Sequence, residues 1–281
     1  MTQVMAVWDL LRHVSLEMTA PRPVTSPSLL PREKGAWGQV LFPMATGLVL
    51  AHGHAAAIAF AAAAIAAFFA HEPMLVLFGG RGDRTRRGAA RRAFAWTAVC
   101  GLIGIAAFAT GVLLAEKSAH AWLLAPVVLS LGSLAALASG RERTTPGEIL
   151  AASAMSSWIV PMAVAASVRS ATAVHTWMAY VVAFTAATLA VRGVLEAFRN
   201  QGRSRLRQVA RVVSPALLTA SVVAWLAGQW PVWIPVALAP TLVLSLVLSI
   251  RELHPRQLRT VGWSLIASTA FLAVVLAASS A

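Results

Sequence analysis

The sequence predicts an all-α integral membrane protein with nine transmembrane helices, its N-terminus inside and its C-terminus outside. Apolar residues of the set AVILMFWYC make up 58% of the 281 residues, and only 12% are charged, about half the share in a globular protein. The mean hydropathy is +0.73. This composition excludes a disordered chain and, despite the formal net charge of +13, a water-soluble nucleic-acid binder. The single cysteine, Cys100, excludes a secreted disulfide scaffold.

Residues 1–30 are expected to form a cytoplasmic tail ahead of a single polytopic transmembrane domain, residues 31–281. Val4, Val7 and Leu11 recur at helical spacing, which predicts a short amphipathic surface helix. A proline-rich linker follows it. The alternative is a tail without fixed structure. Charged residues interrupt this stretch, so it is not expected to be a secretory signal.

Nine apolar runs then follow with short loops between them, and each is long enough to be considered as a membrane span. The runs are 36–51, 55–78, 94–114, 121–138, 148–168, 176–197, 212–228, 233–250 and 260–278. The first run is the shortest. If it did not cross the membrane, every later loop would change sides.

The distribution of basic residues supports nine crossings. Lysine and arginine outside spans concentrate on the cytoplasmic side of membrane proteins. With nine spans and an inside N-terminus, 21 of the 23 basic residues lie inside, and only Lys117 and Arg169 lie outside. A missing span would scatter these residues over both faces. We therefore expect a multi-pass membrane protein with its N-terminus in the cytoplasm.

Three residues near the inner ends of spans, His71, Glu72 and Glu196, are candidates for proton exchange with a ligand. Glu72 lies within the second apolar run in His71-Glu72-Pro73, where a carboxylate is costly unless it is paired or faces a wet cavity. Glu196 follows Arg192 by one helical turn, so that the two are expected to pair. The alternative is that His71 and Glu72 only tie helices together and that Arg192 extends to the interface.

Two arginine-rich loops, after the second and sixth spans, are candidates for binding an anion. Each combines Phe-x-x-x-Gly with several arginines. The candidate ligand-binding residues are Arg81, Arg84 and Arg203 of these loops and Arg192 near the inner end of the sixth span. Guanidinium groups suit phosphate. The alternative is that the loops only fix the topology and attract anionic lipid headgroups. The glycine-rich segment at residues 79–82 lacks the ending of a nucleotide-binding phosphate loop.

No metal site and no cofactor are predicted. Four histidines fall in outer loops with only Glu116 as a nearby acidic residue, which favours ordinary exposed side chains over a metal centre. Cys100 lies within an apolar run and is expected to be buried.

Several motifs resemble the YwiC-like family of bacterial polytopic membrane proteins, over about residues 31–271. They are Pro31-Arg-Glu-Lys-Gly-Ala-Trp37, His71-Glu72-Pro73, Ser139-Gly-Arg-Glu-Arg143 with Pro146-Gly-Glu148, and His254-Pro-Arg-Gln-Leu-Arg259 with Gly262. Where the family usually has a histidine, this chain has Lys34. The first motif makes Lys34 and Trp37 candidate ligand-binding residues. The resemblance implies a multi-pass fold in the bacterial inner membrane and no defined activity.

The architecture is also similar to that of UbiA-type intramembrane prenyltransferases, which have nine helices and polar cytoplasmic loops after the second and sixth. Those enzymes hold Mg²⁺ and a prenyl diphosphate with clustered aspartates. The matching stretches here contain only Glu72 and Asp83 in one loop and Glu196 in the other, too few oxygen ligands for Mg²⁺.

Three functions follow as hypotheses, and the sequence does not decide whether the protein is an enzyme. The first is binding or modification of an anionic amphiphile, isoprenoid or phosphorylated, at the cytoplasmic face, with Glu72, Arg81, Arg84 and Arg203 lining one cavity. The second is transport of a small neutral solute. The third is a non-catalytic role in membrane assembly with an unidentified protein partner. The expected partners are the bilayer and its anionic lipids, and no nucleic acid.

Overall fold

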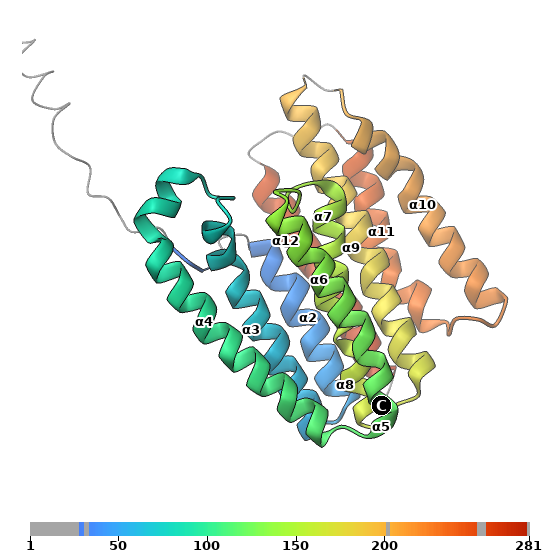
Figure 1. Cartoon of the computed structure of the whole chain (residues 1–281). Coiled ribbons are helices and arrows are strands. Elements are labelled where there is room, and N and C mark those ends of the chain that lie inside the picture. Colours follow the sequence, from blue (N-terminus) through green and yellow to red (C-terminus); the bar gives the residue numbers. More distant parts are fainter. Residues whose placement is uncertain (1–27, 31–33, 201–202, 252–256, 280–281) are drawn as a thin grey trace, which may run out of the picture.

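The computed structural model describes residues 28–30, 34–200, 203–251 and 257–279. Within these ranges all regular secondary structure is helical, which confirms the predicted class (Figure 1). The elements are α2 (Lys34–Leu50), α3 (Ala55–Leu77), α4 (Asp83–Leu114), α5 (Lys117–His120), the 3₁₀ turn η1 (Ala121–Leu123), α6 (Leu124–Ala138), α7 (Thr145–Ser157), α8 (Ile159–Ala165), α9 (Ser170–Arg199), α10 (Arg205–Leu226), α11 (Trp233–Ile250) and α12 (Leu258–Ala278). The predicted N-terminal amphipathic helix lies outside the described residues.

Eight segments of the described chain are long and apolar enough to cross a membrane. They are α3, α4, α5 with η1 and α6, α7 with α8, α9, α10, α11 and α12. The first predicted span, α2, is shorter: its 17 residues extend ~25 Å at 1.5 Å per residue, against ~30 Å of hydrocarbon. The chain is a multi-span membrane protein, and a count of nine crossings depends on α2.

The main apolar core lies between α2, α3, α8, α9, α11 and α12. Phe60, Ile159 and Leu238 are completely buried there. The hydroxyl groups of Tyr180 in α9 and Thr46 in α2 share a hydrogen bond of 2.7 Å, which satisfies both polar groups inside the core. Helix α2 is thus an integral part of the bundle.

Three segments lie at the periphery. In the most apolar stretches of α4, α6 and α10 only 11%, 17% and 17% of the residues are buried, compared with 61% in α3. Large apolar side chains such as Leu102, Ile105 and Leu113 of α4 are therefore exposed. A surface of this kind is suited to contact with lipid tails.

Helices α4, α9 and α10 extend beyond the predicted spans. Helix α4 begins at Asp83, so that most arginines expected in a loop occupy its first three turns. Helix α10 begins at Arg205 after Ser204, whose hydroxyl accepts a hydrogen bond from the backbone N–H of Arg207. The prediction of loops was wrong here because hydropathy detects only the part of a helix that matches hydrocarbon, whereas arginine and alanine also favour helix in water.

The fifth predicted span is interrupted at Trp158, between α7 and α8. Pro161 has no N–H to donate to the carbonyl of Ser157, which weakens the helix at this point. The indole ring of Trp158 lies 6.2 Å from the ring of Phe60 and 6.1 Å from that of Phe108. Trp158 therefore packs between helices.

Candidate functional site

Most basic residues gather at one end of the bundle, which we call the arginine-rich end. The turns between α3 and α4, α6 and α7, and α9 and α10 lie there, and the marked C-terminus lies at the opposite end (Figure 1). The described basic residues of these turns and adjoining helix ends are Lys34, Arg81, Arg84, Arg86, Arg87, Arg91, Arg92, Arg141, Arg143, Arg192, Arg199, Arg203, Arg205, Arg207, Arg211, Arg251 and Arg259. Lys117 and Arg169 lie in the turns of the opposite end.

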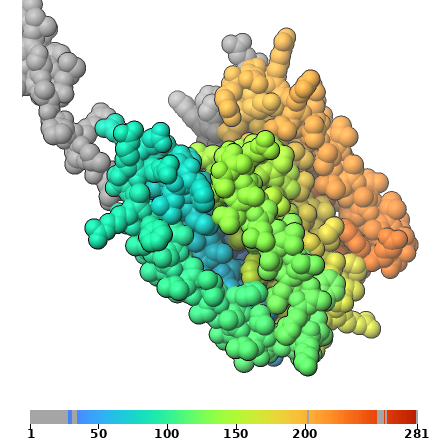
Figure 2. All heavy atoms as spheres, in the orientation of Figure 1, coloured from blue at the N-terminus to red at the C-terminus, as the bar shows by residue number. Residues whose placement is uncertain are grey.

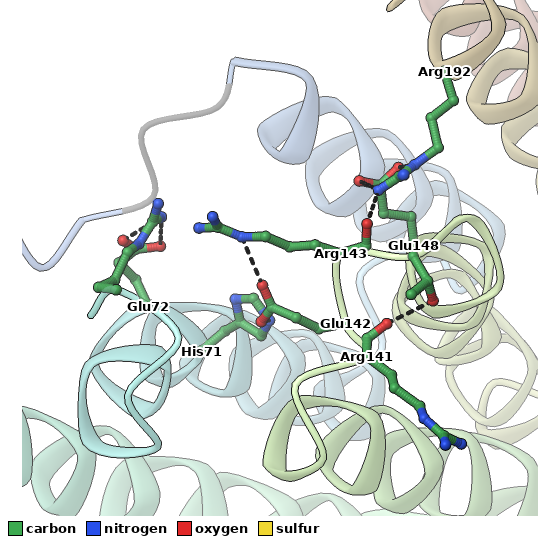
Figure 3. A network of polar contacts seen from close by, with 9 residues as sticks. His71, Glu72, Arg141, Glu142, Arg143, Glu148 and Arg192 are labelled. Carbon is green, nitrogen blue, oxygen red and sulfur yellow. Dashed lines mark hydrogen bonds and ion pairs between the residues drawn. The ribbon is translucent and has the colours of Figure 1, made fainter. Parts of the chain in front are cut away.

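Glu72 and Arg81 form an ion pair across the turn that joins α3 to α4 (Figure 3). The Arg81 guanidinium lies 2.5 Å from Glu72 Oε1, and the two side chains are 6% and 26% exposed, Glu72 being the more buried. Gly79 and Gly82, with φ of 81° and 87°, allow the chain to reverse within a few residues. Of the two expectations for this carboxylate, pairing and exposure to a wet cavity, the structure shows pairing.

The turn between α6 and α7 lies beside His71 (Figure 3). His71 Nε2 is 3.8 Å from Glu142 Oε2, longer than a hydrogen bond, so the contact is electrostatic and requires a protonated imidazole. Glu142 also accepts a hydrogen bond of 3.1 Å from Arg143 Nε. The imidazole side chain is 44% exposed. His71 is thus accessible at the arginine-rich end with a carboxylate beside it.

The same turn is anchored on α7 by local contacts. The Thr144 hydroxyl accepts a hydrogen bond from the backbone N–H of Gly147 and donates one of 2.6 Å to the Arg141 carbonyl. A Cβ atom at Gly147 would clash with the Arg141 carbonyl oxygen and lie 2.6 Å from that of Glu142. Only glycine therefore allows the turn to lie so close to the start of α7.

Arg192 pairs with Glu148, and the predicted pairing with Glu196 was wrong. Its Nε and a terminal nitrogen donate hydrogen bonds of 2.7 and 2.6 Å to the two Glu148 oxygens. The guanidinium also donates to the backbone carbonyl of Arg143. The arginine turns toward α7 because a carboxylate and a carbonyl lie there together, whereas a residue one turn away offers only a flexible surface pair.

Glu196 instead contributes to the start of α10. It accepts a hydrogen bond of 2.5 Å from the Ser204 hydroxyl and one of 3.1 Å from the backbone N–H of Leu206. Gly193 of α9 permits this approach, since a Cβ atom there would lie 2.8 Å from the Arg207 backbone nitrogen. Glu196 therefore has a structural role at a helix N-terminus, where a negative charge is favourable.

Two further arginines bind the C-terminal end of α11. Arg207 donates to the backbone carbonyls of Ser249, Ile250 and Arg251, and Arg211 donates to the Ser249 carbonyl at 2.9 Å. Cations stabilise the carbonyl groups that end a helix. Both arginines are thereby occupied within the protein.

The remaining candidates belong to different turns and helices. Arg84 and Arg203 are exposed, and the two turns that precede α4 and α10 lie on separate sides of the bundle (Figure 1). Trp37 packs its ring 5.2 Å from Phe68 and 5.6 Å from Phe69, on α3. Lys34 begins α2, and its side chain lies outside the description. The structure pairs Glu72 with Arg81, and a common cavity that also includes Arg84 and Arg203 stays a prediction.

Glu142, Arg143 and Glu148 are functional candidates that sequence reasoning did not select. All three belong to the motifs on which the family resemblance was based, which was the available signal. Their partners, His71 of α3 and Arg192 of α9, lie 44 or more positions away in the sequence. Pairs this far apart leave no local pattern in the sequence. Among the residues that the structure describes, no three His, Cys, Asp or Glu side chains are grouped as metal ligands.

Comparison with known proteins gives one match. The family model described as YwiC-like protein matches residues 30–163, from the start of α2 through most of α8, including the turn between α6 and α7. The match does not reach His254 to Gly262, where part of the expected resemblance lay. No curated protein and no solved structure matches the chain. This multi-span membrane protein is YwiC-like over residues 30–163, as the motifs of its first half predicted.

Proposed function

We propose that the chain crosses the bacterial inner membrane nine times, with the arginine-rich end in the cytoplasm. The burial of α2 supports a ninth crossing, since Val40, Met44 and Leu50 are all at most 2% exposed. Only Lys117 and Arg169 then lie on the outer side, which agrees with the preference of basic residues for the cytoplasm. A helix shorter than the hydrocarbon thickness is accommodated by local thinning of the bilayer.

At the cytoplasmic face, the proposed function is to bind an anionic amphiphile. The observation that carries this proposal is the surface of α4, where exposed arginines are followed directly by exposed aromatic rings. Its first three turns carry Arg84, Arg86, Arg87, Arg91 and Arg92, all exposed. Phe94 and Trp96 come next and are 68% and 42% exposed. Guanidinium groups bind phosphate oxygens, and aromatic rings are favoured at headgroup level.

The surface beside α4 offers room for the apolar part of such a ligand. In the space-filling view, α4 and α6 are separated by a hollow through which residues of the region around α2 and α3 are visible (Figure 2). Both peripheral helices expose large apolar side chains, among them Leu102, Ile105 and Leu131. An acyl or isoprenoid chain in this hollow would extend away from the arginines of α4, as the geometry of an amphiphile requires.

In the proposed site, the ion pairs near α4 hold the neighbouring turns in position. Glu72 neutralises Arg81 and fixes the turn from which α4 starts. Arg192 and Glu148 hold the turn that carries Glu142. His71, which is close to Glu142 and partly exposed, is the proposed group for proton exchange with a bound headgroup. Arg203 precedes α10 rather than α4 and is not part of the proposed site.

A second candidate function, transport of a small neutral solute, is favoured by the interruption at Trp158. Broken helices are characteristic of transporter binding sites. Ser156 and Ser157 are completely buried next to the break, and the indole N–H of Trp158 has no hydrogen-bond partner in the described part of the chain. Uptake of labelled neutral solutes into proteoliposomes would favour this alternative if it depended on Trp158.

The test of the proposed function is the amount of amphiphile that copurifies with the protein. The full chain is purified in mild detergent, and bound lipids are quantified by mass spectrometry. We expect Arg84→Gln/Arg87→Gln to lose most of an anionic species. The control, Arg199→Gln/Arg205→Gln, removes the same charge from exposed positions at the same end and is expected to retain it. Equal loss in both variants would contradict a site on α4 and indicate general attraction of anionic lipid.

A further inference from the structure

We propose that a surface hollow at the end opposite the arginine-rich end binds a small organic anion through a carboxylate or phosphate group. The hollow has a volume of about 500 Å³ and lies between the starts of α9 and α11 and the end of α12. Its lining residues are Arg169, Ser170, Ala171, Thr172, His175, Pro231, Trp233 and Ser279. This site is separate from the proposed amphiphile site on α4.

Arg169 lies at an unusual place for a basic residue. Among the basic residues that the structure describes, it is one of two at this end, where the positive-inside tendency disfavours them. Among the described residues, no carboxylate forms an ion pair with Arg169. The nearby acidic residue Glu116 accepts hydrogen bonds from Ser118 and Ser167 instead. A guanidinium that lines a hollow and has no acidic partner within the described part of the chain is available to bind an anion.

The start of α9 and the polar residues around Arg169 also favour an anion. Arg169 directly precedes α9, and a cation at the start of a 30-residue helix is opposed by the positive end of the helix dipole. An anion in the hollow would offset this repulsion, because it attracts both the Arg169 guanidinium and the positive end of the α9 dipole. Ser170, Thr172 and His175 line the same space, and hydroxyl and imidazole groups are suitable hydrogen-bond donors for an anion.

The apolar lining residues of the hollow indicate that the anion carries an apolar part. Pro231 and Trp233 present apolar surface there, and the ring of His175 lies 6.4 Å from that of Trp230. Inorganic phosphate would leave this apolar surface unused, whereas an organic anion with an apolar or aromatic part would cover it. The same anionic chemistry is offered by the headgroup of an outer-leaflet lipid, so the experiment must separate the two sources.

The test uses the full chain in nanodiscs of neutral phosphatidylcholine, with phenyl phosphate as the probe in isothermal titration calorimetry. We expect one binding event per chain. Arg169→Gln is expected to weaken it at least about tenfold, as for the loss of a charge-assisted hydrogen bond. Lys117→Gln removes the other positive charge of this end, outside the hollow, and is expected to leave the affinity unchanged. Inorganic phosphate is expected to bind more weakly than phenyl phosphate.

A second set of nanodiscs containing phosphatidylglycerol distinguishes the sources. If the anionic lipid lowers the apparent affinity of the wild-type chain for phenyl phosphate, the site accepts a headgroup. If it does not, the site takes a free anion. Absence of binding by the wild-type chain, or equal affinity of the wild-type and Arg169→Gln proteins, would overturn the proposal. Unchanged size-exclusion and circular-dichroism profiles of the Arg169→Gln protein ensure that a weakened affinity does not reflect misfolding.

Discussion

Arg192 of α9 holds Glu148 of α7 with two hydrogen bonds, although Glu196 lies only one turn away on its own helix. The same guanidinium binds the backbone carbonyl of Arg143 in the turn between α6 and α7. One side chain therefore fixes the relative position of two helices and a turn. Through Glu142, that turn also reaches His71 of α3.

This arrangement predicts that Arg192→Lys destabilises the protein although the charge is kept. An ammonium group lacks the planar fork that binds two oxygens at once. We expect the free energy of unfolding to fall by about 1–2 kcal/mol, the scale of a charge-assisted hydrogen bond at a partly exposed site. Unfolding in mixed detergent measures this change. Arg199→Lys, on the exposed end of the same helix, is the control, and equal stability of the two variants would disprove the assigned role.

The pair of Glu72 and Arg81 predicts non-additive effects on stability. Replacing either residue by methionine leaves the other charge largely out of water, and each single change is expected to cost about 2–3 kcal/mol. Removing both charges in Glu72→Met/Arg81→Met is expected to cost clearly less than the sum of the two. The double-mutant cycle is measured by the same unfolding assay. Additive costs would mean that the two side chains act independently.

The close contact at Gly147 predicts a large effect of a single methyl group. Gly147→Ala places a Cβ atom 2.6 Å from the Glu142 carbonyl oxygen, so the turn must move away from α7. We expect a loss of about 1–3 kcal/mol, as for overpacking. Gly88 of α4 has no atom within 4 Å of the corresponding Cβ position and provides the control. Gly88→Ala is expected to be neutral or slightly stabilising, and a comparable loss in both variants would rule out the steric explanation.

The proposed crossing of α2 predicts opposite accessibility of its two ends. Ser28 precedes α2 and His54 follows it, and both are exposed in the structure. In a Cys100→Ala background, Ser28→Cys is expected to react with a membrane-impermeant maleimide only after cell lysis. His54→Cys is expected to react in intact cells. Reaction of both from the same side would show that α2 does not cross.

The sequence allowed the helical class and most spans to be predicted because a long apolar run is a local property of the chain. It did not predict where helices end, since the arginine-rich start of α4 is helical without being apolar. It also did not predict the break at Trp158, which combines a proline effect with the packing of Phe60 and Phe108 from other helices.

The candidate site was predictable only in part for a related reason. The unusual position of Glu72 in an apolar run indicated a carboxylate that is either paired or faces a wet cavity, and the structure shows it buried and paired with Arg81. The choice of Glu148 over Glu196 as the partner of Arg192 depends on how α7 packs against α9, which no spacing within one helix reveals. Which arginines remain exposed likewise depends on the helix ends and carbonyls that the other arginines bind.

The proposed location of the arginine-rich end in the cytoplasm is tested most directly by cysteine labelling at four exposed positions of the Cys100→Ala protein in intact cells. We expect Lys117→Cys and Gln229→Cys to react with an impermeant maleimide, and Arg86→Cys and Arg205→Cys to react only after lysis. Labelling of position 86 or 205 from outside would contradict the topology and, with it, an amphiphile site at the cytoplasmic face.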